Sequence, residues 1–227
     1  MNTMISNEKK DIRAIAFDMD GLMFDTESVC LRAHIEAGTQ LNIANPDKLY
    51  FSSLAMTYDN MKIFYSGILE NPKLAEQFVD LISEISMNIY KNEKLRIKPG
   101  LFELLTFLSE NHYPIAIASS APDYEIEHHL NETGISEYFS KIVSGANLEH
   151  GKPAPDIYLL TSQVLSITPE NMLVLEDSIF GIESAYAANA IPVMIPDLVN
   201  PNESAMSKAY AILNNLTEVI PLLKKNR

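Results

Sequence analysis

The sequence has one cysteine, few basic residues and no long apolar run, and each scarcity narrows the class of protein. Cys30 is the only cysteine among the 227 residues, so no disulfide can form within the chain and we expect a reducing, cytoplasmic environment. The 17 Lys and Arg residues stand against 30 Asp and Glu, and this net charge of −13 argues against a nucleic-acid surface. No apolar run reaches the length of a membrane span, so we expect no membrane insertion.

The first ten residues are polar and lack the apolar segment of a secretory signal. We interpret residues 1–10 as a short frayed tail. The hydrophobic fraction of the whole chain, 47%, is enough for a sizeable core and unlike that of a disordered protein.

Short apolar runs alternate with segments of helical periodicity over much of the chain, which predicts βαβ units and a parallel sheet. The expected strands are 12–17, 113–118, 141–144, 172–175, 191–195 and 210–213. The expected helices are 101–111, 123–133, 155–165, 181–189 and 216–225. The predicted fold class is therefore α/β, with a Rossmann-like three-layer core around a parallel sheet.

One segment breaks this alternation. From Met23 to about Arg96, apolar residues recur at helical spacing and strand-like alternation is scarce, until Pro99-Gly100 ends the segment. We predict an all-helical insert over residues 23–96 and a discontinuous core made of residues 1–22 and 97–227. Because the insert leaves directly after the first strand, we expect it to act as a lid over the carboxyl edge of the sheet.

Two aspartates, Asp18 and Asp20, follow the first expected strand, and Gly21 permits a sharp exit from it. Ligands of open α/β sheets bind outside the carboxyl ends of the strands, so this pair suits a divalent cation and an anionic substrate. Solvated acids at a strand end are the plainer explanation, and this motif alone does not decide between the two.

Three further elements favour the functional interpretation. Ser119 and Ser120 end the second strand and are candidates to hold a phosphoryl oxygen, or else cap the following helix. Lys152 lies between Gly151 and Pro153, which restrict its backbone and favour a positioned ammonium over a solvated one. Two adjacent acids, Glu176 and Asp177, end another apolar strand.

These residue types suggest phosphoryl transfer. Asp18 is a carboxylate nucleophile able to form an aspartyl-phosphate, and Asp20 is placed to protonate the leaving oxygen and then activate water. Hard oxygen ligands suit Mg²⁺, and the metal with Lys152 would offset the charge of the transferring group.

With these four motifs in order, the chain resembles the haloacid dehalogenase-like (HAD) hydrolase superfamily over nearly its whole length. It is most similar to the helical-cap members, the phosphoglycolate phosphatase and beta-phosphoglucomutase group. The stretch Asp177-Ser178-x-x-Gly181-Ile182 before an Ala-rich helix is also typical, while Asn189 replaces the usual glycine at the end of that helix and tolerates the same left-handed backbone.

The resemblance implies a role for each site residue. Asp18 is the nucleophile and Asp20 the general acid/base. Mg²⁺ is bound by the Asp18 carboxylate, the Asp20 main-chain carbonyl and Asp177. Glu176 either binds the metal directly or contacts the groups that do. Ser119 and Lys152 hold the phosphate, aided by main-chain amides near Met19 and Asp20.

The sequence leaves the reaction partly open. We favour a Mg²⁺-dependent phosphatase of a small phosphorylated metabolite, such as a sugar phosphate, acting as a monomer. The alternative is a phosphomutase like beta-phosphoglucomutase, but Cys30 and Tyr58 stand where that group carries His and Arg, and Ala55 replaces a Gly. A third hypothesis is an inactive scaffold, against which the complete set of motifs argues.

Overall fold

The computed structural model describes residues 3–6, 8–54, 56 and 58–226, so Ala55 lies outside the described residues. The chain divides into two compact units. One unit, the core, joins Met1–Asp25 to Arg96–Arg227, and the other, the inserted unit, is Thr26–Leu95.

The core is built on a seven-stranded sheet in the order β1-β7-β6-β5-β2-β3-β4. All neighbouring strands are parallel except β1 and β7, which are antiparallel. The strands are β1 (Met4–Ile5), β2 (Ala14–Phe17), β3 (Ile115–Ser119), β4 (Lys141–Ser144), β5 (Met172–Glu176), β6 (Ile191–Met194) and β7 (Ala211–Ile212).

The antiparallel edge strand corrects the expectation of a frayed N-terminal tail. Met4 pairs with Ile212 and Ile5 with Ala211, and the Ser6 amide donates to the Tyr210 carbonyl at 2.9 Å. A two-residue strand has no periodicity of its own, so its pairing depends on an unoccupied edge of β7 that only the folded sheet provides.

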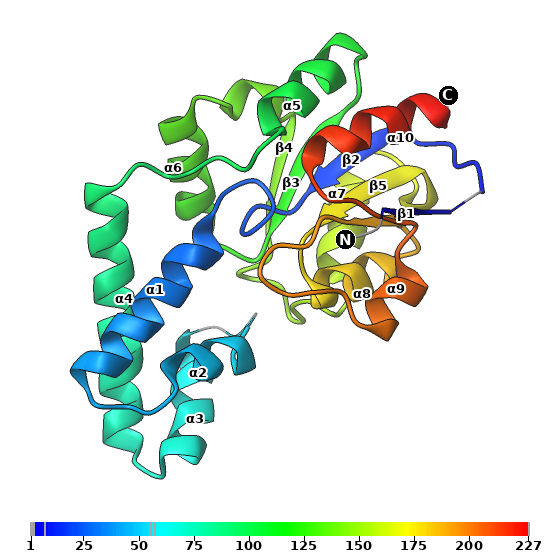
Figure 1. Cartoon of the computed structure of the whole chain (residues 1–227). Helices are drawn as coiled ribbons and strands as arrows, with labels where there is room; N and C mark the ends of the chain where they lie inside the picture. The colour runs from blue at the N-terminus through cyan, green and yellow to red at the C-terminus, as the bar shows by residue number, and fades with distance from the viewer. Residues whose placement is uncertain (1–2, 7, 55, 57, 227) are drawn as a thin grey trace. The chain divides into compact units, whose positions relative to one another are not determined.

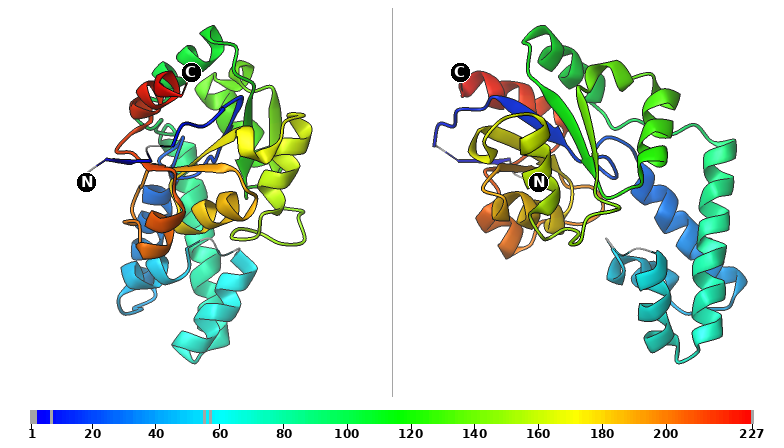
Figure 2. Two further views of the ribbon diagram at one scale, coloured as in Figure 1. Left: turned by 90° about the vertical axis from the view of Figure 1, so that its right-hand side faces the viewer. Right: turned by 180° about the vertical axis from the view of Figure 1, so that it is seen from behind.

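Helices cover both faces of this sheet, as the views in Figure 2 show, with α5 and α10 on one face and α7 on the other. This is the three-layer α/β arrangement that the sequence predicts. The core helices are α5 (Leu101–Glu110), α6 (Asp123–Thr133), α7 (Asp156–Val164), α8 (Ile179–Ala187), α9 (Glu203–Lys208) and α10 (Val219–Lys225), with single 3₁₀ turns η1 (Ser136–Tyr138), η2 (Pro169–Asn171) and η3 (Leu216–Glu218).

The central strands β2 and β5 are buried along their whole length. Strands of a parallel sheet that are covered on both faces read as continuous apolar runs, because no side of the strand meets water. Here the runs are Ala-Ile-Ala-Phe and Met-Leu-Val-Leu, each of which is followed directly by an acid. The sequence therefore places charged side chains only where each strand leaves the sheet.

The inserted unit is entirely helical among its described residues, with α1 (Thr26–Gln40), α2 (Pro46–Ser52), α3 (Tyr58–Leu69) and α4 (Pro72–Asn92). Figure 1 shows α1 and α4 side by side. Helix α4 begins with Pro72 after Asn71, whose side chain accepts from the Leu74 amide at 3.1 Å. Its buried residues Phe78, Ile82 and Ile89 recur on one face and pack into the core of the unit.

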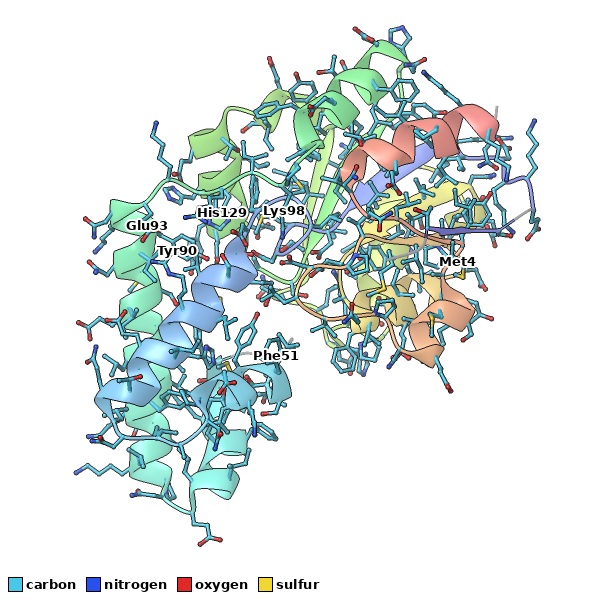
Figure 3. All side chains as sticks on the ribbon, viewed as in Figure 1. Met4, Phe51, Tyr90, Glu93, Lys98 and His129 are labelled. Carbon is cyan, nitrogen blue, oxygen red and sulfur yellow. The ribbon has the colours of Figure 1, made fainter. Side chains whose placement is uncertain are left out.

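The two chain segments that lead into and out of the inserted unit pair with each other within the core. The Asp25 amide donates to the Arg96 carbonyl at 2.9 Å, and the Lys98 amide donates to the Met23 carbonyl at 2.9 Å. The Lys98 side chain (Figure 3) also forms an ion pair of 2.5 Å with Asp197, beyond the end of β6. This ion pair fixes the exit segment to the carboxyl edge of the sheet.

Among the described residues, no helix is long and apolar enough to span a membrane.

Candidate active site

The polar residues expected at strand ends meet at one edge of the sheet because their strands are neighbours. Strand β2 lies between β3 and β5, in register with both, and the Asp18 amide still donates to the Leu175 carbonyl at 3.0 Å. Asp18 thus continues β2 by one residue, while Ser119 and Glu176 are the last residues of β3 and β5. Parallel pairing brings these three side chains to the same edge.

Lys152 joins two of these strand ends. Its Nζ lies 2.6 Å from Asp18 Oδ1 and 2.6 Å from Glu176 Oε1, and 3.5 Å from the Ala118 carbonyl. The three side chains are buried, with exposed fractions of 8% for Lys152, 9% for Asp18 and 0% for Glu176. Charge-assisted hydrogen bonds this short are strong where water is excluded, so the ammonium is held between the two carboxylates.

Asp20 and Ser119 form a second contact at the same edge. The Ser119 hydroxyl donates to Asp20 Oδ2 at 3.5 Å and accepts from the Ala121 amide at 3.0 Å. Gly21 has φ +76°, a left-handed backbone that glycine adopts readily and that allows the sharp exit expected after this strand.

The remaining predicted substrate-binding residues flank this contact. Met19 is fully buried, and its carbonyl accepts from the Met23 amide at 2.9 Å. Ser120 is exposed.

Asp18, Glu176 and Asp177 form an acidic cluster. One carboxylate oxygen from each lies within 4.8 Å of the others. With Asp20, four carboxylates gather around the Lys152 ammonium. Such a set of oxygen donors with surplus negative charge fits a hard divalent cation.

Within this cluster Glu176 differs from the two aspartates, because donors already occupy both of its oxygens. Oε1 accepts from Lys152 at 2.6 Å, and Oε2 accepts from the Ser178 hydroxyl at 3.0 Å and the Ser178 amide at 3.4 Å. Glu176 therefore serves first as the partner of Lys152.

Burial and charge shift the ionisation of the central pair. Burial raises the pKa of the Asp18 carboxyl well above its usual range, against the charge of Lys152, and the nearby Glu176 and Asp20 raise it further. For Lys152, burial acts to lower the pKa, but the charges of Asp18 and Glu176 outweigh it and the pKa lies well above its usual value. Lys152 thus stays cationic and available to an anionic group.

Tyr158, a fully buried residue of α7, lies outside the four motifs but belongs to the site. Its hydroxyl donates to Glu176 Oε1 at 2.5 Å, and its ring lies under Lys152, with Nζ 5.3 Å from the centroid. Burial, and then the charge of Glu176, raise the pKa of Tyr158 well above its usual value, so it remains a donor. The signal in the sequence is weak: a tyrosine six residues after Lys152, inside an otherwise ordinary apolar helix face.

Helix α6 contributes two further groups near Asp20. Burial and the charge of Asp20 raise the pKa of Glu125 to about 7. One turn later, His129 (Figure 3) is only 3% exposed and packs edge-on against Phe24, with ring centroids 5.6 Å apart. As a polar residue on a predicted helix, His129 is expected at the surface. This expectation is wrong, because α6 turns that face toward Phe24 in the loop after β2.

The comparisons with known proteins agree with this geometry. Residues 15–195 match the model of a protein family described as haloacid dehalogenase-like hydrolase. The chain belongs to this family and is an enzyme of it. The resemblance suggested by the four motifs is confirmed.

Two curated relatives cover most of the chain. A phosphorylated carbohydrates phosphatase from Thermotoga maritima is 29% identical over 217 residues, which are 92% of this chain and 100% of the relative. Hexitol phosphatase B from Escherichia coli is 25% identical, covering 92% of this chain and 95% of the relative.

Solved structures share the fold. A Thermotoga maritima protein with the provisional name beta-phosphoglucomutase has a TM-score of 0.76 at 26% identity, covering 94% of this chain and 99% of its own. A haloacid dehalogenase-like protein from Agrobacterium tumefaciens has a TM-score of 0.79 at 20% identity, covering 94% and 98%. The α/β fold predicted from the sequence is thus the fold of the family.

Proposed function

We propose that the protein is a Mg²⁺-dependent phosphatase of small phosphorylated carbohydrates. The observation that carries this proposal is the buried Lys152 ammonium, 2.6 Å from Asp18 at the end of the central strand. A carboxylate next to a fixed cation suits attack on a phosphoryl group, because the cation offsets charge on the oxygens of that group. The names of the curated relatives support a carbohydrate ester as substrate.

In the first step, a carboxylate oxygen of Asp18 forms a bond to phosphorus while the bond from phosphorus to the ester oxygen breaks. Asp20 gives a proton to the departing sugar oxygen, which leaves as an alcohol. Lys152 and the Ser119 hydroxyl donate to the phosphoryl oxygens. The product of this step is an aspartyl-phosphate on Asp18.

In the second step, Asp20 takes a proton from water, whose oxygen bonds to phosphorus as the bond to Asp18 breaks. Free phosphate leaves and both aspartates return to their starting states. Asp18, Asp177 and the Asp20 carbonyl would hold Mg²⁺, and Glu176 would lie beside it. When bound, Mg²⁺ supplies positive charge that stabilises the transferring group.

We further propose that Thr26–Leu95 is the cap domain of this enzyme and selects the substrate. Ser120 and the amides near Met19 are proposed to complete the phosphate site. We expect the protein to work as a cytoplasmic monomer.

The direct test is a phosphate-release screen over phosphorylated sugars and polyols, with Mg²⁺ or with EDTA. We expect metal-dependent release from a few esters by the wild-type protein and none by Asp18→Asn. An Asp20→Asn protein should lose turnover while still binding phosphate. Metal-dependent turnover that survives in a contaminant-free Asp18→Asn protein would overturn the proposed mechanism.

The structural likeness to the provisionally named beta-phosphoglucomutase keeps a mutase as the second candidate. In that case the phosphoryl group would pass from Asp18 to a second sugar hydroxyl instead of water. Incubation with glucose 1-phosphate and a bisphosphate activator distinguishes the two. Glucose 6-phosphate as product would favour the mutase, and free phosphate without the isomer would exclude it.

A further inference from the structure

Tyr158, a residue of α7, contacts both members of the ion pair between Lys152 and Glu176. Its hydroxyl donates to Glu176 Oε1 at 2.5 Å, and its ring supports the Lys152 ammonium at 5.3 Å from the centroid. Tyr158 is fully buried, and its hydroxyl is directed at the same oxygen that binds Lys152. It therefore belongs to the site geometrically, although it lies outside the four motifs.

Glu176 has no freedom to adjust around this contact. Ser178 donates its hydroxyl to Oε2 at 3.0 Å, which fixes the far oxygen. The carboxylate also lies directly against Gly181 at the start of α8, where a Cβ atom would come within 1.8 Å of Glu176 Cδ. The carboxylate is thus fixed in place, and its two donors at Oε1 must share that oxygen.

This sharing affects where Lys152 can reach. The ammonium lies 2.6 Å from both Asp18 and Glu176, so two buried carboxylates compete for it. A donor on Glu176 Oε1 satisfies part of that oxygen's hydrogen-bonding capacity and weakens its attraction for Lys152. Without this donor, Glu176 would draw the ammonium away from Asp18, where the phosphoryl group is transferred.

We propose that the Tyr158 hydroxyl is a positioning group that keeps Lys152 placed for the phosphoryl group at Asp18, by sharing Glu176 Oε1 with it. The kinetic part of this inference rests on the proposed phosphatase function. The geometric part, the position of Lys152, does not.

The test compares Tyr158→Phe with a matched control, Thr161→Val. The first change removes the hydroxyl and keeps the ring under Lys152. The second removes an equally buried hydroxyl from the same helix, one that donates only to the Ile157 carbonyl at 2.7 Å. A purely structural effect should lower the melting temperature of the two variants alike and leave the site unchanged.

Two measurements follow, with inorganic phosphate as the probe. We expect Tyr158→Phe to weaken competitive inhibition by phosphate and to lower kcat/KM, each by about tenfold. Thr161→Val should stay within about twofold of wild type in both. Equal phosphate inhibition in the two variants would overturn the proposal.

A crystal structure of Tyr158→Phe separates this proposal from the function itself. We expect the distance from Lys152 Nζ to Asp18 to exceed hydrogen-bonding range, compared with 2.6 Å in the wild type. An unchanged distance would overturn the positioning role even if the protein is a phosphatase. A lengthened distance in a protein that releases no phosphate from any ester would support the positioning role while the proposed function fails.

Discussion

Replacing Gly181 by alanine tests the site where helix propensity and packing make opposite predictions. Gly181 is helical and lies in the first turn of α8, where propensity alone favours alanine by about 1 kcal/mol. The structure opposes this gain, because the added Cβ would lie 1.8 Å from Cδ, 1.9 Å from Oε1 and 2.0 Å from Oε2 of Glu176. No atoms can occupy these positions together, so the carboxylate must move.

The cost of that movement comes from the donors that it leaves. Glu176 is fully buried and accepts from Lys152, Tyr158 and Ser178. A buried donor or acceptor left unsatisfied costs about 1–3 kcal/mol, and overpacking a core costs about 1–3 kcal/mol. Against a gain of about 1 kcal/mol, we expect a net loss of about 3 kcal/mol in the free energy of unfolding.

Gly67 in α3 is the matched control, since a Cβ added there meets nothing within 4 Å. We expect Gly67→Ala to raise the free energy of unfolding by about 0.5–1 kcal/mol. Urea unfolding followed by far-UV circular dichroism measures both, and phosphate release from the best ester measures the site. Gly181→Ala should also lose about 100-fold in kcat, because Lys152 loses its anchor. A Gly181→Ala protein that is as stable and active as Gly67→Ala would refute the reasoning.

Two further predictions concern buried charge in the core. Glu125 keeps its proton up to a pH of about 7 in the folded protein but loses it near pH 4.5 when unfolded, so it makes stability fall as pH rises between these values. After allowance for partial exposure, Glu125→Gln should remove about 1–2 kcal/mol of this fall in stability. Urea unfolding in EDTA at pH 5 and pH 8 measures the free energy of unfolding of both proteins. A difference between wild type and variant that is the same at both pH values would contradict the prediction. Lys98→Met should cost about 2 kcal/mol by leaving the partly buried Asp197 unpaired, and Lys98→Met with Asp197→Leu should recover most of it in the same assay.

The regular elements of the core could be predicted closely because their local patterns are strong. The predicted helix at 123–133 and strand at 141–144 match α6 and β4 residue for residue. Asn189, just after α8, has φ +60°, the left-handed conformation expected of a residue standing in for glycine at a helix end.

The elements that the prediction missed are short and depend on their neighbours. Helix α2 has seven residues and α9 six, too few to show a helical period. Strand β1 exists only through its pairing with β7. In each case the local sequence leaves several conformations close in energy, and a contact with a distant segment selects one of them.

Residue types and spacing were sufficient to place acids and hydroxyls at strand ends, with a lysine on a neighbouring loop, because parallel strands bring their carboxyl ends to one edge. The resemblance of these motifs to a known family then indicated which family it is. Residue types and spacing also predicted a sharp exit from the first strand at Gly21, whose φ is +76°. What they could not reveal is which atoms meet. The bridge from Lys152 to Asp18 and Glu176, the hydroxyl of Tyr158 and the close approach of Gly181 join residues that are far apart in the chain or lie inside ordinary helices. Such contacts depend on how α7 and α8 pack against the sheet, and no local pattern encodes that packing.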